Sequence, residues 1–175
     1  MSLESLTPAS RKKKRQYISF PHMKETVFEK HRGVNKVEIK KGFAQVELSE
    51  LPKPITQSRL DILAKLHDKK VNVDFLKLTN CGLAFTVQES DLSLIEKILG
   101  NNYECCNIQP DRNIMLIHAV NMRDEEGLIA DIIAIASSQK ITIDQVSDMH
   151  DRLLLVTSED SAKKLKTQIE KELMD

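Results

Sequence analysis

Two stretches of this 175-residue chain repeat one another at a constant offset, and no other feature constrains the fold as much. Ile132 and Ile133 in the later stretch correspond to Ile62 and Leu63 in the earlier one, an offset of 70 in numbering. The same offset aligns 44–48 with 114–118, 71–74 with 141–144, 83–87 with 153–157 and 92–99 with 162–169. One shift without a gap thus aligns five successive segments. The alternative is two unrelated α+β stretches of similar length, and an internal repeat explains the alignment better.

The hydrophobic pattern of each copy predicts a helix followed by two strands. In the second copy, apolar residues within 128–136 recur at helical spacing. Ile141 and Ile143 then alternate with polar neighbours, which is typical of a strand with one buried face. The apolar run 153–156 predicts a more buried strand, and the polar segment 147–151 predicts the turn before it. A helix stripe and a sheet face of this size must cover each other.

The full order predicted for a copy is βαββαβ. In the first copy we expect a strand at 43–48, a helix at 57–69 capped by Thr56, strands at 71–76 and 83–87, a helix from Ser90 or Asp91 to Leu99, and a strand at 103–108. In the second copy we expect a strand at 113–120, a helix at 126–138, strands at 140–146 and 152–157, and a helix at 160–172. Right-handed crossovers fold this order into a four-stranded antiparallel sheet with two helices on one face, the ferredoxin-like arrangement. The predicted fold class is α+β.

The second copy has no fourth strand of its own, and one alternating segment, 34–40, is left over. A tight turn at Lys41–Gly42 is predicted to separate it from the strand 43–48. Because an unpaired sheet edge is a liability, we expect 34–40 to complete the second sheet.

Charge is balanced over the whole chain, with 26 Lys plus Arg and 26 Asp plus Glu. This balance gives no argument for a polyanionic partner. Residues 1–32 nevertheless hold eight basic and three acidic residues, so their net charge is +5 and that of the remainder is −5. The polar segment 1–16, with its basic run 11–15, predicts a disordered tail. A solvated leader is the favoured interpretation, and contact with nucleic acid or an acidic surface is the alternative.

Three cysteines, Cys81, Cys105 and Cys106, fit neither a disulfide framework nor a zinc site. They suit a reducing compartment. The sequence has no apolar run of membrane length and no hydrophobic signal segment at its start. We therefore expect a soluble, cytoplasmic protein without a membrane partner.

Motifs for catalysis and nucleotide binding are missing from the sequence, including the phosphate-binding glycine loops, the nucleophile elbow and the H-E-x-x-H zinc motif. The five histidines are not at ligand spacing: His22, His31, His67, His118 and His150. His118 occupies an apolar strand position, where a partly buried structural histidine is expected. We predict no catalytic residues, no metal and no cofactor.

The junctions between the first strand and first helix of each copy are the best candidate sites. Helix N-termini present unpaired N–H groups that attract carboxylates. In the second copy this junction is 121–127, and Asp144 and Ser147 are expected across the sheet from it. A ligand with a carboxylate and an ammonium would suit these surfaces. A purely structural role, with Asp124 capping the helix and Asp144 exposed, is at least as well supported by the residues alone.

The pair of βαββαβ units resembles tandem ACT domains, above all the regulatory region of aspartokinases. The residues that carry the resemblance in the second copy are Asn121-Met122, Gly127, 142–144, Val146-Ser147 and 153–156. In the first copy they are 72–74, 83–87 and 90–92, together with the opening segment 32–34. The chain departs from the family pattern at Pro52, Pro54, Gln57, Glu126 and Thr142. No kinase domain is present in the chain.

This resemblance implies a non-catalytic, amino-acid-binding regulatory module that forms homodimers. The alternatives are a regulatory subunit or fragment of an aspartokinase, paired with a kinase subunit, and an ACT assembly module that binds no ligand. The implied domains are 42–110, and 33–40 together with 111–175, with 1–32 as tail and linker. The effector would be lysine or threonine. The implied ligand-binding residues are Thr56, Gln57, Ser58, Asn72 and Asp74 in the first copy and Met122, Asp124, Gly127, Asp144 and Ser147 in the second.

Overall fold

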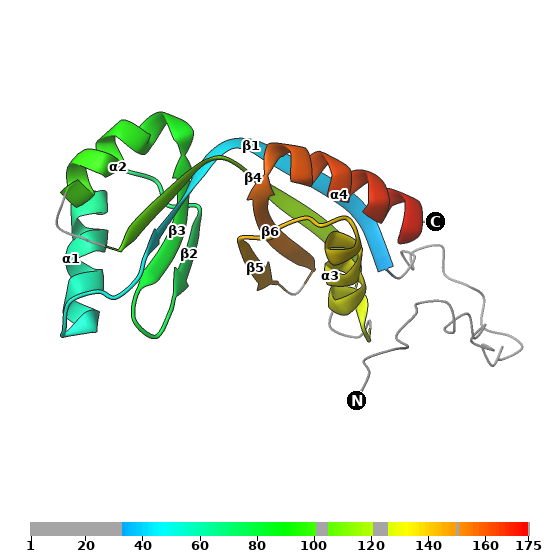
Figure 1. Ribbon diagram of the computed structural model, residues 1–175, viewed down its shortest axis with the longest axis horizontal. Helices are drawn as coiled ribbons and strands as arrows, with labels where there is room; N and C mark the ends of the chain where they lie inside the picture. The colour runs from blue at the N-terminus through cyan, green and yellow to red at the C-terminus, as the bar shows by residue number, and fades with distance from the viewer. Residues whose placement is uncertain (1–32, 101–104, 121–125, 150, 175) are drawn as a thin grey trace, which may run out of the picture. The chain divides into compact units, whose positions relative to one another are not determined.

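A computed structural model describes residues 33–100, 105–120, 126–149 and 151–174 of the chain (Figure 1). All of them belong to one compact unit, His31–Asp175. Its elements are β1 (Gly33–Leu48), α1 (Ile55–Asp68), β2 (Phe75–Leu78), β3 (Leu83–Gln88), the short 3₁₀ helix η2 (Glu89–Asp91), α2 (Leu92–Leu99), β4 (Cys106–Val120), α3 (Leu128–Ser138), β5 (Gln145–Asp148), β6 (Arg152–Ser158) and α4 (Glu159–Glu172).

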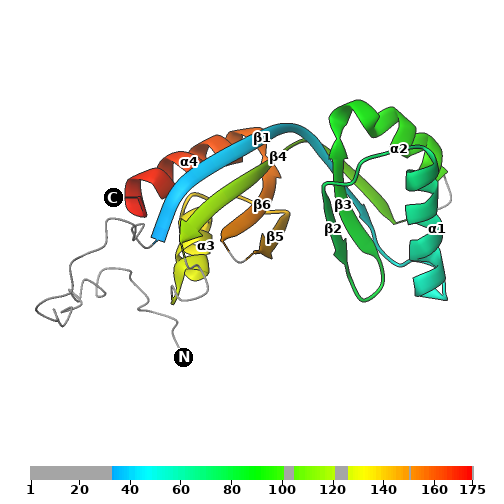
Figure 2. The ribbon, with the colours of Figure 1, turned by 180° about the vertical axis from the view of Figure 1, so that it is seen from behind.

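The described strands form one antiparallel sheet of six strands in the order β2-β3-β1-β4-β6-β5 (Figures 1 and 2). The expected α+β class is confirmed. β2 and β5 are the two edge strands of this sheet.

β1 and β4 are long central strands that lie side by side, and this corrects two sequence predictions. The expected turn at Lys41–Gly42 is wrong, because β1 runs through it without a break. β4 likewise continues through Pro110 where we expected a strand to end. Gly42 has φ 79° and Asp111 has φ 55°, and the pairing register of β1 with β4 shifts between Lys40 and Gln45. The backbone thus accommodates these residues as strand irregularities instead of reversing direction.

Segment 34–40 of β1 pairs with 114–119 of β4, from Val34 opposite Ala119 to Lys40 opposite Ile114. Segment 43–48 of the same strand pairs with β3 and with 106–112 of β4. The segment left over in the sequence therefore lies beside the first strand of the second copy.

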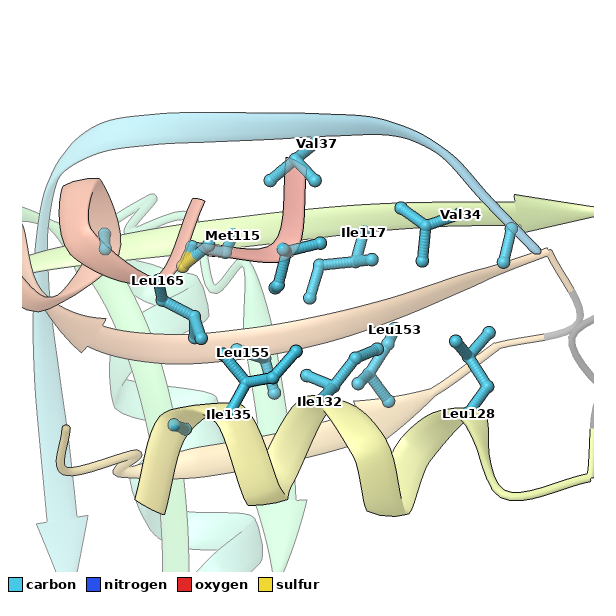
Figure 3. Packing of buried hydrophobic residues seen from close by; sticks show 14 residues of the cluster. Val34, Val37, Met115, Ile117, Leu128, Ile132, Ile135, Leu153, Leu155 and Leu165 are labelled. Atoms are coloured by element: carbon cyan, nitrogen blue, oxygen red, sulfur yellow. The ribbon is translucent and has the colours of Figure 1, made fainter. Parts of the chain in front are cut away.

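Two buried cores lie beneath two pairs of helices. The second copy's core joins α3 and α4 to β1, β4 and β6; Figure 3 shows Leu128, Ile132 and Ile135 of α3 pointing toward β6, which contributes Leu153 and Leu155. The first copy's core joins α1 and α2 to β1 and β3, and its fully buried members include Ile62, Leu66, Phe85, Ile95 and Leu99. The helical periodicity placed Ile62, Leu66, Leu128 and Ile132 in the interior correctly. It was wrong for Leu60, Ile129 and Ile133, which are exposed, and it missed the buried Ile135.

A third buried cluster was not predicted, and it occupies the opposite face of the strands. On β6, Leu154 and Val156 belong to it, whereas their neighbours Leu153 and Leu155 belong to the helix-covered core. Alternation along a strand sends successive side chains to opposite faces. The full cluster is Phe43, Phe75, Ile114, Leu116, Leu154 and Val156, so both copies contribute to it.

The strands expected at 71–76 and 140–146 begin later than predicted, at Phe75 and Gln145. Residues before them are in contact with the helical cores: Val71 is buried, and Ile141 and Ile143 are partly buried. Lys70 and Lys140 turn the chain with φ 57° and 54°. The alternation in these segments therefore reflects packing beneath a helix and not pairing in the sheet.

Strand pairing also corrects the repeat alignment in one segment. Ala44 faces Val87 on β3, and Asn113 faces Thr157 on β6, which is the second copy's counterpart of Val87. Ala44 thus corresponds to Asn113 and not to Ile114, the next residue along β4. A slip of one residue exchanges the two faces of a strand. The sequence alignment therefore matched Ala44, in the helix-covered core, with Ile114, in the buried cluster on the opposite face.

Candidate functional site

The first copy's predicted residues divide into two groups. Thr56, Gln57 and Ser58 lie in the first turn of α1, where the Gln57 side chain donates to Asp61 (2.7 Å) and Ser58 Oγ donates to the Pro52 carbonyl (2.8 Å). Thr56 does not cap the helix, because α1 begins at Ile55, two residues before the predicted start at 57, with Pro54 at its N-cap position. Ser90 and Asp91, predicted as caps of the next helix, lie in η2, and Asp91 makes no capping bond.

Asn72 and Asp74 are exposed and lie just before the first residue of β2, away from the β2–β3 turn. The backbone N–H of Asp74 donates to Thr86 on β3 (3.0 Å). The start of α1 is instead held at the β2–β3 turn, since the Arg59 guanidinium donates to the carbonyls of Gly82 (3.1 Å) and Thr79. Within one chain the two groups are therefore not brought together.

Three of the second copy's five predicted residues are described, namely Gly127, Asp144 and Ser147. Met122 and Asp124 lie outside the described residues. Gly127 is the N-cap of α3 with φ 89°, and its carbonyl accepts from the Asp131 N–H (2.9 Å). Asp144 immediately precedes β5, where its N–H donates to Val156 (2.8 Å), and Ser147 lies within β5.

Asp144 has a partner that sequence reasoning missed. Arg112 Nε on β4 lies 2.7 Å from Asp144 Oδ2, and the two side chains are only 21% and 10% exposed. The N–H does not point along the contact, so this is an ion pair without a linear hydrogen bond. The other guanidinium nitrogens donate to Gln109 Oε1 (2.9 Å) and to the Pro110 carbonyl (3.2 Å). The sequence signal was a basic residue two positions before the apolar run that begins at Ile114 in β4.

Burial sets the electrostatics of this pair. Desolvation raises the pKa of Asp144 above its ordinary value, and the nearby charge of Glu47 adds to the rise. The positive charge of Arg112, in close contact with the carboxylate, lowers the pKa but does not outweigh the desolvation. Ionisation of Asp144 in the folded protein is therefore unfavourable in free energy, and Arg112 reduces this penalty.

Gln145, beside Asp144, is a second buried polar residue. It is 4% exposed, and neither its amide oxygen nor its amide nitrogen has a hydrogen-bond partner within the described structure. Its counterpart in the first copy is Phe75, which is apolar. The second copy is therefore more polar than the first around the start of its edge strand.

Asp74 and Ser147, which the sequence assigned to different sites, line one groove of about 280 Å³. β2 and β5 form its walls, and its lining includes one acidic residue, Asp74, and one basic residue, Lys77. The complete lining is Asp74, Phe75, Leu76, Lys77, Val146, Ser147, Met149 and Leu154.

Among the described residues, no group of three or more His, Cys, Asp or Glu side chains is arranged to hold a metal ion. In the same part of the chain, every helix is too short or too polar to cross a bilayer.

Comparison with solved structures identifies the fold, whereas no family model and no curated protein sequence matches the chain. The ligand-free regulatory subunit of aspartate kinase from Thermus thermophilus matches with a TM-score of 0.70 and 16% identity over 80% of this chain and 97% of that one. A C-terminal regulatory domain of aspartate kinase from Porphyromonas gingivalis, described as putative, matches with a TM-score of 0.65 and 16% identity over 80% and 97% of the two chains.

E. coli aspartokinase III in complex with lysine and aspartate has a TM-score of 0.62 and 9% identity, over 82% of this chain and 34% of that chain. This chain matches 97% of the Thermus regulatory subunit but only 34% of aspartokinase III. The shared fold is therefore that of the regulatory part. The resemblance inferred from sequence is thereby confirmed at the level of structure: this chain has the fold of the regulatory subunits and C-terminal regulatory regions of aspartate kinases.

Proposed function

We propose that this chain is a non-catalytic regulatory module of aspartokinase type, which senses an amino acid and has no kinase activity of its own. One observation carries the proposal, namely the fold match over 97% of a regulatory subunit that contains no kinase domain. The two alternatives from sequence, a subunit working with a separate kinase chain and an assembly module without ligand, remain outcomes of the tests below. Phosphotransfer catalysed by the purified chain alone would contradict the proposal.

The module consists of two ACT domains, 42–110 and 33–40 with 111–175. The separate helix-covered cores of the two copies support this division. The pairing of 34–40 with 114–119 supports the assignment of the early segment to the second domain. Nothing in the proposed function requires the basic segment 1–32. We place the protein in the cytoplasm, as its cysteine usage suggested.

Homodimerisation is the second part of the proposal, and exposed apolar side chains at the sheet edges support it. Leu76 and Leu78 on the edge strand β2 are 46% and 57% exposed, and Leu60 on α1 is 58% exposed. The other edge has Ile129 and Ile133 on α3 and Met149 after β5. Side-by-side pairing with a second copy covers such edges.

Pairing also accounts for the divided site. Thr56, Gln57 and Ser58 lie at one end of β2, and Asn72 and Asp74 at the other. When two copies of an edge strand pair antiparallel, the start of one lies beside the end of the other. One copy's Asp74 then approaches the partner copy's α1 N-terminus, and a complete site forms between chains.

The ligand is an amino acid, bound with its ammonium at a carboxylate and its carboxylate at helix N–H groups. Asp74 is exposed and belongs to no ion pair within the described structure, so its carboxylate is available. In the second domain the corresponding set is Met122, Asp124, Gly127, Asp144 and Ser147, of which Asp144 already has Arg112 as partner. Lysine, which is present in the E. coli enzyme complex, and threonine are the first effectors to test.

A thermal-shift screen of the twenty protein amino acids tests the proposal, because a ligand that binds the folded state raises the melting temperature. Calorimetry of the best ligand should then show about ten- to a hundredfold weaker binding to Asp74→Ala, the usual cost of losing a charge-assisted contact. Asp68→Ala, at the exposed end of α1, is the matched control and should bind normally.

Three results contradict parts of the proposal. A screen without any stabilising amino acid favours the ligand-free assembly module. A ligand whose affinity neither Asp74→Ala nor Asp144→Ala reduces shows that the site is elsewhere. Copurification with a kinase chain that requires this protein for its regulation favours the subunit alternative.

A further inference from the structure

The two carboxylates assigned to ammonium binding have equivalent positions but different surroundings. Asp74 donates its N–H to Thr86, and Asp144 donates its N–H to Val156, so donor and acceptor are both related by the offset of the repeat. The Asp74 residue is exposed, whereas the Asp144 side chain is 10% exposed and paired with Arg112.

The strand register explains the difference. Arg112 faces Ser158 on β6, and Phe43 faces Gln88 on β3, which is the first copy's counterpart of Ser158. Phe43 is therefore the first copy's counterpart of Arg112. A buried phenylalanine side chain has no charge to offer a carboxylate, so the first copy lacks the internal cation that the second copy has.

We propose that the Arg112 guanidinium fills the place beside the Asp144 carboxylate that a ligand ammonium would otherwise take. The second copy then binds no effector, and effector binding depends on Asp74. The assignment of Arg112 stands on the geometry of this chain alone. Its consequence for sensing rests on the proposed function.

Arg112 is difficult to displace, because all three of its guanidinium nitrogens have partners. Nε contacts Asp144, and the two terminal nitrogens donate to Gln109 Oε1 and the Pro110 carbonyl. A ligand ammonium entering at Asp144 would have to break the ion pair and leave the partly buried guanidinium without its counter-charge, which is strongly unfavourable. Asp74 is exposed and has no ion pair within the described structure, so a ligand ammonium there breaks none.

Removal of the arginine side chain should convert the second copy into a site for an external cation. In Arg112→Ala, we expect methylguanidinium chloride to raise the melting temperature in a saturable manner, measured against equal concentrations of sodium chloride. The wild-type chain should show no such rise. The double variant Arg112→Ala/Asp144→Asn should lose it, because the counter-charge is gone.

Each result decides the assignment. A saturable rise confined to Arg112→Ala supports it, as does recovery of the fold by methylguanidinium if that variant does not fold alone. A rise in the double variant equal to that in Arg112→Ala, or none in Arg112→Ala, overturns it. Arg112→Met keeps the aliphatic stem and should respond less than Arg112→Ala, because the stem fills the space; an equal response overturns the proposal.

Effector stoichiometry tests the consequence separately. Calorimetry of the wild-type chain with the amino acid found by thermal shift should give one equivalent per chain, and Asp74→Asn should bind this equivalent about ten- to a hundredfold more weakly. Two equivalents, or one whose affinity Asp74→Asn leaves unchanged, overturn single-copy sensing. If no amino acid binds, the proposed function fails, while the methylguanidinium result still decides the role of Arg112.

Discussion

Gln145 illustrates how one residue can mark the difference between two copies of the same unit. A buried amide without hydrogen-bond partners destabilises a fold by about 1–3 kcal/mol. Gln145 is such a residue, and its counterpart Phe75 belongs to the apolar cluster on the same face. The second copy therefore has a polar position where the first is apolar.

We predict that Gln145→Leu stabilises the protein, because leucine needs no hydrogen-bond partner and extends the cluster around Leu154 and Val156. A gain of about 1–3 kcal/mol corresponds to several degrees in melting temperature. Gln88→Leu, on an exposed residue of β3, is the control and should change it little. A lower melting temperature for Gln145→Leu would mean that the amide has a partner such as a buried water.

The raised pKa of Asp144 predicts how the free energy of unfolding depends on pH. Its pKa is raised in the folded protein, chiefly by desolvation, so the folded state holds the proton more tightly than the unfolded state. Its contribution to stability must then fall as the pH rises from the ordinary aspartate pKa through the raised value. Asp144→Asn cannot ionise, so over this interval it should lose less stability than the wild-type protein, as measured by urea unfolding at a series of pH values.

Loss of Arg112 should shift this titration further upward, because Arg112 is the group that lowers the pKa of Asp144. Carboxyl-carbon NMR of Arg112→Ala should therefore report a higher Asp144 pKa than in the wild-type chain. Arg152→Ala, which removes an exposed pair with Asp151, should leave Asp144 unchanged. An Asp144 pKa that is the same with and without Arg112 would contradict the ion pair.

At the scale of elements, α3 offers neighbouring residues with opposite surroundings. Ile132 is fully buried among β6 and α4 side chains, whereas Ile133 is 37% exposed on the same helix (Figure 3 labels Ile132). We expect Ile132→Ala to cost about 2–5 kcal/mol of unfolding free energy, with the cavity adding to the lost apolar burial. Ile133→Ala should cost clearly less. Urea unfolding followed by circular dichroism measures both, and equal costs would contradict the placement of the second core.

Helices and inner strands could be predicted from sequence because each has a strong period and few competing explanations. Ile62 and Leu66, or Leu165 and Ile169, are buried as their spacing indicated. The edge strands were misplaced because Val71 and Ile141 alternate for a different reason, namely contact with a helix. The turn at Gly42 was wrong because a positive φ serves an irregular strand as well as a hairpin.

The candidate site was only partly predictable. Equivalent carboxylates at Asp74 and Asp144 follow from the repeat, and their backbone bonds are indeed equivalent. Arg112 could not be found in this manner, because its partner depends on which strands are adjacent and on a register that the sequence alignment misjudged by one residue. The groove that joins Asp74 to Ser147 likewise depends on tertiary contacts between the copies.

At the scale of the whole molecule, the proposed homodimer depends on the exposed edges. Leu78 lies on the edge strand β2 with 57% of its surface exposed. A lysine on an edge strand opposes pairing, since its charge would have to be buried in the contact. We therefore predict that Leu78→Lys dissociates the dimer while leaving the circular dichroism spectrum unchanged, and that Thr167→Lys, on the exposed face of α4, does not.

Sedimentation equilibrium at micromolar concentration provides the measurement. The wild-type chain should sediment with twice the 19.9 kDa mass of one chain, and a chain lacking residues 1–16 should do the same, since the basic tail has no part in the contact. Leu78→Lys should sediment with the mass of one chain. Because the proposed effector site needs Asp74 from one copy and the α1 N-terminus of the other, this monomer should also lose the effector. A wild-type monomer that still binds the amino acid would require a site complete within one chain, and the groove lined by Asp74, Lys77 and Ser147 would then be the place to examine.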